Sequence, residues 1–211
     1  MKVDSKCKIC RRLGTKLFLK GERCFSPKCA MVKRPYSPGQ KGKKRGRRSL
    51  SDYGKSLKEK QKLKKLYNLK EGQFRNYVKG ILKYRGKVED ISSILVKRLE
   101  NRLDNIVFRL GFADSRTQAR QLVSHGHFLV NNRAVNIPSY QIKKGDVIKV
   151  HPSSSKKNIF QNLQNKLKKY QPPSWISLDS EKLEGKIVGS PKMEEINLPV
   201  EISAIFEFYS K

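Results

Sequence analysis

The chain has 211 residues, of which 48 are lysine or arginine and 18 are aspartate or glutamate, so its formal net charge is +30. A small domain needs a net charge of only about 2–8 to stay soluble, and the excess repels itself unless a polyanion offsets it. The longest unbroken apolar run is Cys29–Val32, which excludes a membrane span of roughly 20 residues. Met1–Cys7 has no apolar signal-peptide core. We therefore expect a soluble intracellular or organellar-matrix protein with a nucleic-acid partner and no membrane partner.

Charge is distributed unevenly along the chain. Residues 1–50 carry 17 lysines and arginines against 2 acidic residues, a net charge of +15. Residues 174–211 carry 4 lysines against 7 acidic residues, a net charge of −3. We expect the N-terminal quarter to contact the polyanion and the C-terminal tail to pack against protein.

All four cysteines lie in one N-terminal segment, at Cys7, Cys10, Cys24 and Cys29. Two close pairs, separated by thirteen residues, allow four thiolates to converge on one tetrahedral ion. Nearby lysines and arginines favour thiolates, and the segment has too few large apolar residues to fold by packing alone. Zinc is the predicted metal and a four-cysteine iron–sulfur cluster is the alternative. Two disulfides, or unrelated free thiols, are further alternatives, although nothing in the sequence indicates an oxidising compartment.

A run rich in glycine and cations follows at residues 41–48. Glycine and like charge oppose a stable fold in isolation. We predict an extended arm that follows RNA phosphates and becomes ordered on binding, with a localisation signal or a solvated linker as the alternative. The residues predicted to contact RNA here are Lys41, Lys43, Lys44, Arg45, Arg47 and Arg48.

Helical periodicity begins at Ser51, and three helices are predicted before residue 100. Leu63, Leu66 and Tyr67 share a face of the first. The second repeats apolar residues between Phe74 and Leu82 at the spacing of a core-facing stripe. The third is predicted to start near Val88 and to run through Leu99. The cations that lie four residues apart on the second helix are Arg75, Lys79 and Lys83.

Between residues 99 and 150 the predicted pattern changes from helix to strand. An apolar stripe continues from Leu99 to Leu110, and Gly111 is a predicted helix stop. Ser115–Gln118 has the sequence of a capping box, opening a short helix on which Arg116 and Arg120 project together. Asn131–Asn132 then favours a hairpin turn.

Two more elements are predicted beyond the hairpin. Lys144–Asp146 has the composition of a turn and leads into a strand at Val147–Val150. Ile159, Leu163 and Leu167 stand at four-residue spacing, which predicts one helix closing on the domain.

The motifs between residues 102 and 131 resemble the RNA-binding domain named after the fourth protein of the small ribosomal subunit. The likeness rests on Arg-Leu-Asp-Asn at 102–105, Arg-Leu-Gly-Phe at 109–112 and the run 115–131. The segments that resemble the bacterial and organellar ribosomal family, in its four-cysteine zinc form, are residues 20–30, 53–54, 71–74, 172–176 and 206–211.

This resemblance implies an α+β fold of two main domains. A mostly helical first domain, residues 51–92 with 191–211, carries a zinc knuckle and basic arm at 1–50. An inserted second domain, 93–190, contains a small α/β RNA-binding domain of two helices and a small sheet at about 99–165. The residues predicted to bind RNA outside the arm are Arg75, Lys79, Lys83, Arg98, Arg102, Arg109, Arg116, Arg120, His125, Asn131 and Arg133.

The resemblance also implies a structural role in the small ribosomal subunit. Such proteins bind small-subunit rRNA early in assembly, at a multi-helix junction of the 5′ domain. They lie beside other small-subunit proteins near the mRNA entry path, and they influence decoding accuracy. Some repress translation of their own message. The expected location is the ribosome, in the bacterial cytoplasm or an organellar matrix.

Two alternatives to a ribosomal role remain open. Arg102-Leu103-Asp104 mimics the active-site Arg-Leu-Asp of pseudouridine synthases, whose aspartate attacks the base. The Ser/Thr-Gly continuation of those enzymes is missing, and Leu103 lies within an apolar stripe, so we expect a protein that is not an enzyme. A free RNA-binding regulator of translation is the second alternative.

Overall fold

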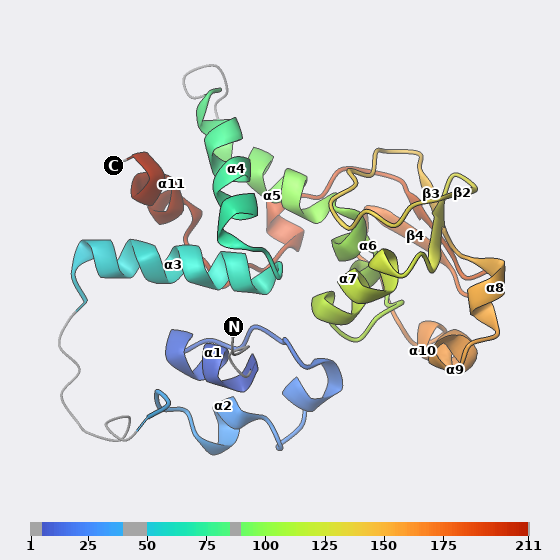
Figure 1. The fold of residues 1–211 in the computed structure, drawn as a ribbon, viewed down its shortest axis with the longest axis horizontal. Helices are drawn as coiled ribbons and strands as arrows, with labels where there is room; N and C mark the ends of the chain where they lie inside the picture. The colour runs from blue at the N-terminus through green and yellow to red at the C-terminus, as the bar shows by residue number, and fades with distance from the viewer. Residues whose placement is uncertain (1–5, 40–49, 85–89, 211) are drawn as a thin grey trace. The chain divides into compact units, whose positions relative to one another are not determined.

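The computed structural model of the chain describes residues 6–39, 50–84 and 90–210 (Figure 1). It divides into two compact units, unit 1 (Met1–Ser92 with Leu198–Lys211) and unit 2 (Ser93–Asn197). The predicted arm at 41–48 lies outside the described residues. Within the described ranges, no helix has both the length and the apolar character needed to cross a bilayer.

In the described part of unit 1 every regular element is a helix, and the C-terminal helix α11 packs against α3 and α4 (Figure 1). The hydroxyl of Ser51 caps α3 by accepting a hydrogen bond from the Gly54 amide at 3.3 Å. Its elements are α1 (Lys6–Leu13), η1 (Gly21–Cys24), α2 (Ala30–Lys33), α3 (Asp52–Leu66), α4 (Glu71–Leu82) and α11 (Ile202–Ser210).

The core of unit 1 follows the predicted helical stripes. Leu63, Phe74, Val78, Ile81 and Ile205 are each 0% exposed. The first four belong to the two faces predicted from apolar spacing, and the fifth comes from α11. The prediction that the C-terminal tail packs against protein is therefore confirmed for α11.

Glu71 joins three helices of unit 1 through its carboxylate. Lys60 donates to it at 2.8 Å, Lys64 donates to its second oxygen, and the Tyr209 hydroxyl donates at 3.0 Å. Partial burial raises the pKa of Glu71, but these hydrogen bonds outweigh burial and lower the pKa to about 2. Since the lysine side chains are only 7% and 10% exposed, Glu71 supplies the counter-charge that their burial requires.

Unit 2 is built on an antiparallel sheet of five strands in the order β2-β1-β3-β5-β4. The strands are β1 (Phe128–Val130), β2 (Arg133–Ala134), β3 (Val147–Val150), β4 (Ile176–Asp179) and β5 (Glu184–Ile187). The helices around it are α5 (Ile91–Glu100), which enters unit 2 at Ser93, α6 (Leu103–Arg109), α7 (Arg116–Ser124), α8 (Pro152–Ser155), α9 (Asn158–Gln161) and α10 (Leu163–Leu167), followed by a 3₁₀ turn η3 (Met193–Glu195).

The predicted hairpin forms between β1 and β2, and the predicted strand after Gly145 is β3. Asn131 and Asn132 have φ angles of +49° and +65°, the left-handed pair that a tight hairpin turn requires. The Asn131 side chain also donates to Asp146 at 2.8 Å and accepts from the Val147 amide at 2.9 Å, which ties the hairpin turn to the start of β3.

Three expectations for unit 2 need correction. Strands β4 and β5, which extend the small sheet on its β3 side, were not predicted from the sequence. The single helix expected through Ile159 and Leu167 is two short helices, α9 and α10, with Ile159 55% exposed. The apolar stripe from Leu99 to Leu110 belongs to two helices, because the chain breaks at Arg102 to form an isolated bridge with Gln141.

Close packing between α6 and the sheet explains Gly185 in β5. A Cβ at this position would lie 2.2 Å from Leu110 Cδ2, a separation that packed carbon atoms do not tolerate. Gly111 ends α6 with a φ of +79°, as predicted. Leu110 can therefore lie directly on the sheet, which fixes α6 and the side chains it carries.

Candidate nucleic-acid interface

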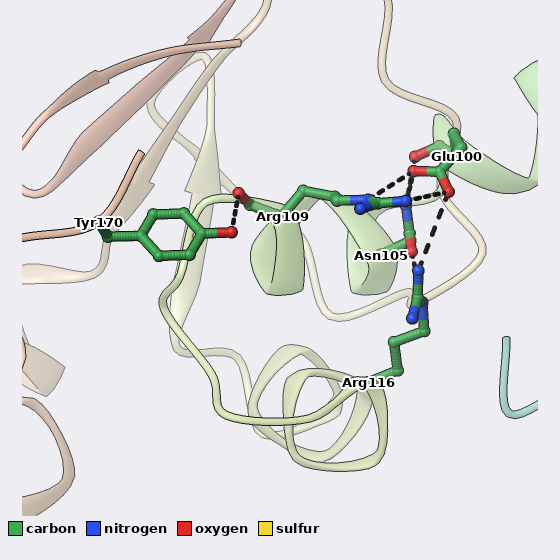
Figure 2. Close-up of polar contacts among 5 residues, drawn as sticks. All are labelled: Glu100, Asn105, Arg109, Arg116 and Tyr170. Carbon is green, nitrogen blue, oxygen red and sulfur yellow. Dashed lines mark hydrogen bonds and ion pairs between the residues drawn. The ribbon is translucent and has the colours of Figure 1, made fainter. Parts of the chain in front are cut away.

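A buried carboxylate organises two of the predicted RNA-binding arginines. Glu100, at the end of α5, has a side chain that is 0% exposed. It accepts hydrogen bonds from Arg109 Nε at 3.0 Å and from an Arg109 terminal nitrogen at 2.8 Å (Figure 2). This two-point pairing fixes the plane of the Arg109 guanidinium, while 23% of that side chain stays exposed.

Asn105 extends this arrangement from Glu100 to a second arginine. Its amide nitrogen donates to Glu100 Oε2 at 2.7 Å, and its amide oxygen accepts from Arg116 Nε at 2.7 Å (Figure 2). An Arg116 terminal nitrogen lies 3.9 Å from Glu100 Oε1, and its guanidinium lies over the Phe108 ring at 4.5 Å. Arg116, on α7, is thus held against α6 by polar and cation–π contacts.

Tyr170 connects the network to the segment after α10. Its hydroxyl donates to the backbone carbonyl of Arg109 at 3.0 Å (Figure 2). Burial raises the pKa of Tyr170, and the nearby Arg109 and Arg116 offset part of that rise. The hydroxyl therefore stays protonated and remains a donor at neutral pH.

Arg102, predicted to contact RNA, is a structural residue. Its side chain is 1% exposed and donates to Asp104 from Nε at 3.0 Å and from a terminal nitrogen at 2.8 Å. The structure gives no support to the predicted RNA contact at Arg102, because the donors of this side chain face a buried partner. A terminal nitrogen of Arg120 lies 4.0 Å from the same carboxylate. The Arg120 side chain is 25% exposed, so it lies between the buried Arg102–Asp104 pair and the surface.

Asp104 has no environment suited to nucleophilic attack on a base. Burial raises its pKa, an effect that hydrogen bonds from Arg102 and the charge of Arg120 oppose. Its side chain is 6% exposed, and its carboxylate forms an ion pair with Arg102. This position within the core accounts for the Arg-Leu-Asp sequence without a catalytic role.

The other predicted RNA-binding residues on unit 2 lie near its surface. His125 and Arg133 are exposed, and Arg98 is half-buried. Asn131 is exposed but its amide group is committed to the hairpin turn. On unit 1, the α4 face predicted from four-residue spacing is exposed at Arg75, Lys79 and Lys83. The predicted contacts at Lys41, Lys43, Lys44, Arg45, Arg47 and Arg48 lie outside the described residues.

Sequence reasoning missed Glu100, the residue that orders this surface. A signal was present, since Glu100 follows Leu95, Val96 and Leu99 on the buried side of α5. Acidic residues at fully buried positions are almost always paired, so this spacing indicates a buried partner. The resulting surface offers guanidinium groups in fixed orientations, which suits the phosphates and shape of folded RNA.

The four cysteines line one pocket, together with Leu19, Lys20 and Met31 among other residues. None of them forms a disulfide. As placed, the His, Cys, Asp and Glu side chains of the described ranges form no group of three that would hold a metal ion. Burial raises the pKa of Cys10, and the three other thiols raise it further while a hydrogen bond with the Leu17 backbone lowers it.

The donor set of this pocket is nevertheless compatible with a thiolate-binding metal. Four sulfur donors on one pocket match the ligands of a structural zinc site. The Lys20 amide lies 3.4 Å from Cys24 Sγ, and a backbone amide of this kind stabilises a thiolate. A cation in the pocket would relieve the mutual repulsion by which the neighbouring thiols raise the Cys10 pKa.

The α6–α7 pair, the small sheet and the arginine surface together define an RNA-binding module of the S4-domain class. Residues 101–148 match the family described as "S4 domain", and residues 2–97 match "Ribosomal protein S4/S9 N-terminal domain". These two matches cover most of the chain. They assign the helical unit and the RNA-binding module to the same class, ribosomal proteins with an S4 domain.

Full-length relatives agree with this assignment. The chain is 49% identical over 209 residues to "Small ribosomal subunit protein uS4" of Caldicellulosiruptor bescii, covering 99% of this chain and 98% of that protein. It is 49% identical over 205 residues to the protein of the same name from Thermus thermophilus, covering 97% and 96%. The chain belongs to the family of small ribosomal subunit protein uS4, in its bacterial type.

Proposed function

We infer that the chain is a structural constituent of the small ribosomal subunit that binds rRNA. The observation that carries this inference is the near-complete match to uS4 proteins, joined to an S4-domain module whose arginines are held in fixed orientations. The family is not enzymatic, and the burial of Asp104 against Arg102 agrees with that. Binding of the purified chain to small-subunit rRNA, measured across salt concentrations, tests the inference directly.

The binding mode follows from the arrangement of cations. Orienting an arginine costs side-chain entropy, and Glu100 and Asn105 already restrict Arg109 and Arg116 before RNA arrives. The exposed α4 cations add phosphate contacts that need no fixed geometry. Recognition therefore combines a pre-ordered surface for folded RNA with a wider electrostatic field.

The finer role extends this inference through the family resemblance. The chain binds a multi-helix junction in the 5′ domain of the rRNA and stabilises it early in assembly of the subunit body. It lies in the ribosome beside neighbouring small-subunit proteins and near the mRNA entry path, where it affects decoding accuracy. The net charge of +30 supports a partner as large and as highly charged as a multi-helix RNA junction. Footprinting of the 5′ domain with and without the protein tests the site of binding.

Zinc is the cofactor that we propose for the cysteine pocket. Cys7, Cys10, Cys24 and Cys29 would hold it, and the ion would supply folding free energy to a segment with little apolar core. An iron–sulfur cluster is the alternative with the same ligands. Elemental analysis with an optical spectrum separates the two, since zinc thiolates are colourless.

A further inference from the structure

Two phenylalanine rings stack on each other at the surface of the cysteine segment. Phe18 lies between α1 and η1, and Phe25 lies directly after Cys24. Their ring centroids are 4.8 Å apart with an interplanar angle of 27°. Phe25 is 76% exposed and Phe18 is 38% exposed, so the pair presents aromatic surface to solvent rather than to the core.

The backbone places Phe18 outward at a conformational cost. Its φ angle is +50°, in the left-handed region that a bulky residue rarely adopts. The neighbours Leu17 and Leu19 are 1% and 8% exposed, so the turn buries both of them while Phe18 projects to Phe25. Rare backbone conformations of this kind persist where the surroundings enforce them, and they cluster at functional sites.

Exposed cations flank the aromatic pair in the sequence. Between residues 16 and 28 they outnumber the acidic residue, Glu22, by four to one. A solvent-exposed aromatic surface within a positive field is unsuited to an apolar protein partner, whose surface would leave the cations without counter-charges. The exposed cations are Lys16, Lys20, Arg23 and Lys28.

We propose that the Phe18–Phe25 pair is a stacking site for an unpaired base of RNA. Unstacked bases in loops, bulges and junctions bind aromatic side chains through their flat faces, and neighbouring cations hold the adjoining phosphates. The proposal rests on the rRNA-binding function and adds a contact outside the arginine surface of unit 2. It assigns to the cysteine segment a direct contact with a base as well as contacts with phosphates.

The test compares variants of the full-length, metal-replete chain for binding to a transcript of the rRNA 5′ domain. Phe25→Leu keeps an apolar side chain but removes the π face, so we expect affinity to fall about 5- to 100-fold, the range seen when one stacked base is lost. The slope of log affinity against log salt stays at the wild-type value, because no phosphate contact is removed. Phe25→Trp retains affinity within about threefold of wild type, since the aromatic face is restored.

Two controls separate stacking from other effects. Tyr53→Leu removes another exposed aromatic side chain, 61% exposed and in ring contact with Phe208, and it leaves affinity unchanged. Lys28→Ala instead lowers the salt slope by about 1. Loss of binding in both Phe25→Leu and Phe25→Trp would overturn the proposal, since a merely structural ring would explain it.

Wild-type affinity in Phe25→Leu would also overturn the stacking site, and it would leave the rRNA-binding function intact. If that variant instead lost binding only to a neighbouring small-subunit protein, the surface would be a protein contact and the proposal would be wrong. Failure of the wild-type chain to bind the transcript would contradict the proposed function itself, which distinguishes the two failures.

Discussion

Glu100, wholly buried, accepts two hydrogen bonds from the guanidinium of Arg109, at 3.0 Å and 2.8 Å. A negative charge beneath the proposed RNA-binding surface opposes binding through its field, yet this carboxylate orders the cations that make the surface. The two effects have opposite signs, so a single substitution can tell which is larger.

Glu100→Gln keeps the size of the side chain and removes its charge. We expect rRNA affinity to fall roughly tenfold, because Arg109 and Arg116 must then be ordered on binding at about 0.5–1.5 kcal/mol each. We also expect a loss of about 1–3 kcal/mol in the free energy of unfolding, since the NH₂ group that replaces one carboxylate oxygen cannot accept a hydrogen bond from the buried donor facing it. Filter binding and thermal unfolding measure the two effects.

The matched control is Glu184→Gln, which removes the charge of a partly exposed carboxylate paired with Lys149 at 2.8 Å. Such a pair contributes about 0–1 kcal/mol, and its loss leaves RNA binding unchanged or slightly stronger. If Glu100→Gln unfolds the domain, Arg109→Lys keeps the charge but not the two-point pairing, and the same fall in affinity is expected. Tighter rRNA binding in a folded Glu100→Gln protein would show that the field outweighs the ordering.

Replacing Arg75 and Lys79 together by Gln tests the exposed face of α4. If both contact phosphates, the slope of log affinity against log salt falls by about 2. Stability changes by less than about 0.5 kcal/mol, because neither side chain is buried. Lys182→Gln with Lys192→Gln removes the same charge from the acidic C-terminal segment and serves as the control. Equal slopes of log affinity against log salt for the two double variants would show that α4 does not contact RNA phosphates.

The sequence predicts long, strongly periodic elements of this fold well and short or paired features poorly. The α4 stripe at Phe74, Val78 and Ile81 and the Asn131–Asn132 turn are confirmed, because a repeated spacing or a required φ angle is written in the local residues. Strands β4 and β5 were missed, since they are short and β5 joins the sheet only by pairing with β3, more than thirty residues earlier in the chain.

Arg102 shows the limit for the candidate site. Arg102 was predicted to bind RNA together with Arg98 and Arg109, but the helix breaks there and the Arg102 side chain pairs with Asp104 in the core. Which arginine of a basic stripe is buried depends on a carboxylate two residues away and on the packing of the sheet. The charge pattern alone carries no such information. The buried role of Glu100 was missed for the same reason.

Removal of the proposed zinc ion should affect one segment only. A strong zinc chelator is expected to speed hydrogen exchange in residues 6–39, because they have little apolar core of their own. The sheet and helices of unit 2 keep their protection, since their core is formed by apolar packing. Added zinc restores the protection, and Cys10→Ser reproduces the loss. Full protection in a protein shown to contain no metal would contradict the zinc proposal.

Acid should weaken unit 1 through Glu71. Its pKa in the folded protein, about 2, lies below the ordinary value of 4.5, so its ionised form adds stability that is complete above about pH 5. That stability disappears as the pH falls towards 2. Because the side chain is 46% exposed, solvent screening limits the contribution to about 1 kcal/mol.

The comparison of wild type with Glu71→Gln from neutral pH down to about pH 2 measures this contribution. The variant melts a few degrees below wild type at neutral pH, and the two curves converge at the acid end. Tyr209→Phe removes one of the donors to Glu71 and gives an intermediate curve. A difference in melting temperature between wild type and Glu71→Gln that stays constant at every pH would show that the carboxylate charge does not contribute to stability.

Co-sedimentation with small ribosomal subunits tests the central inference most directly. The tagged chain, expressed in a bacterial host, should remain with small subunits through a high-salt wash and protect a junction of the 5′ domain from chemical modification. The Glu100→Gln variant should be retained less well than Glu184→Gln under the same wash. Release of the wild-type chain from small subunits at high salt, with no protection of small-subunit rRNA, would contradict a structural ribosomal role.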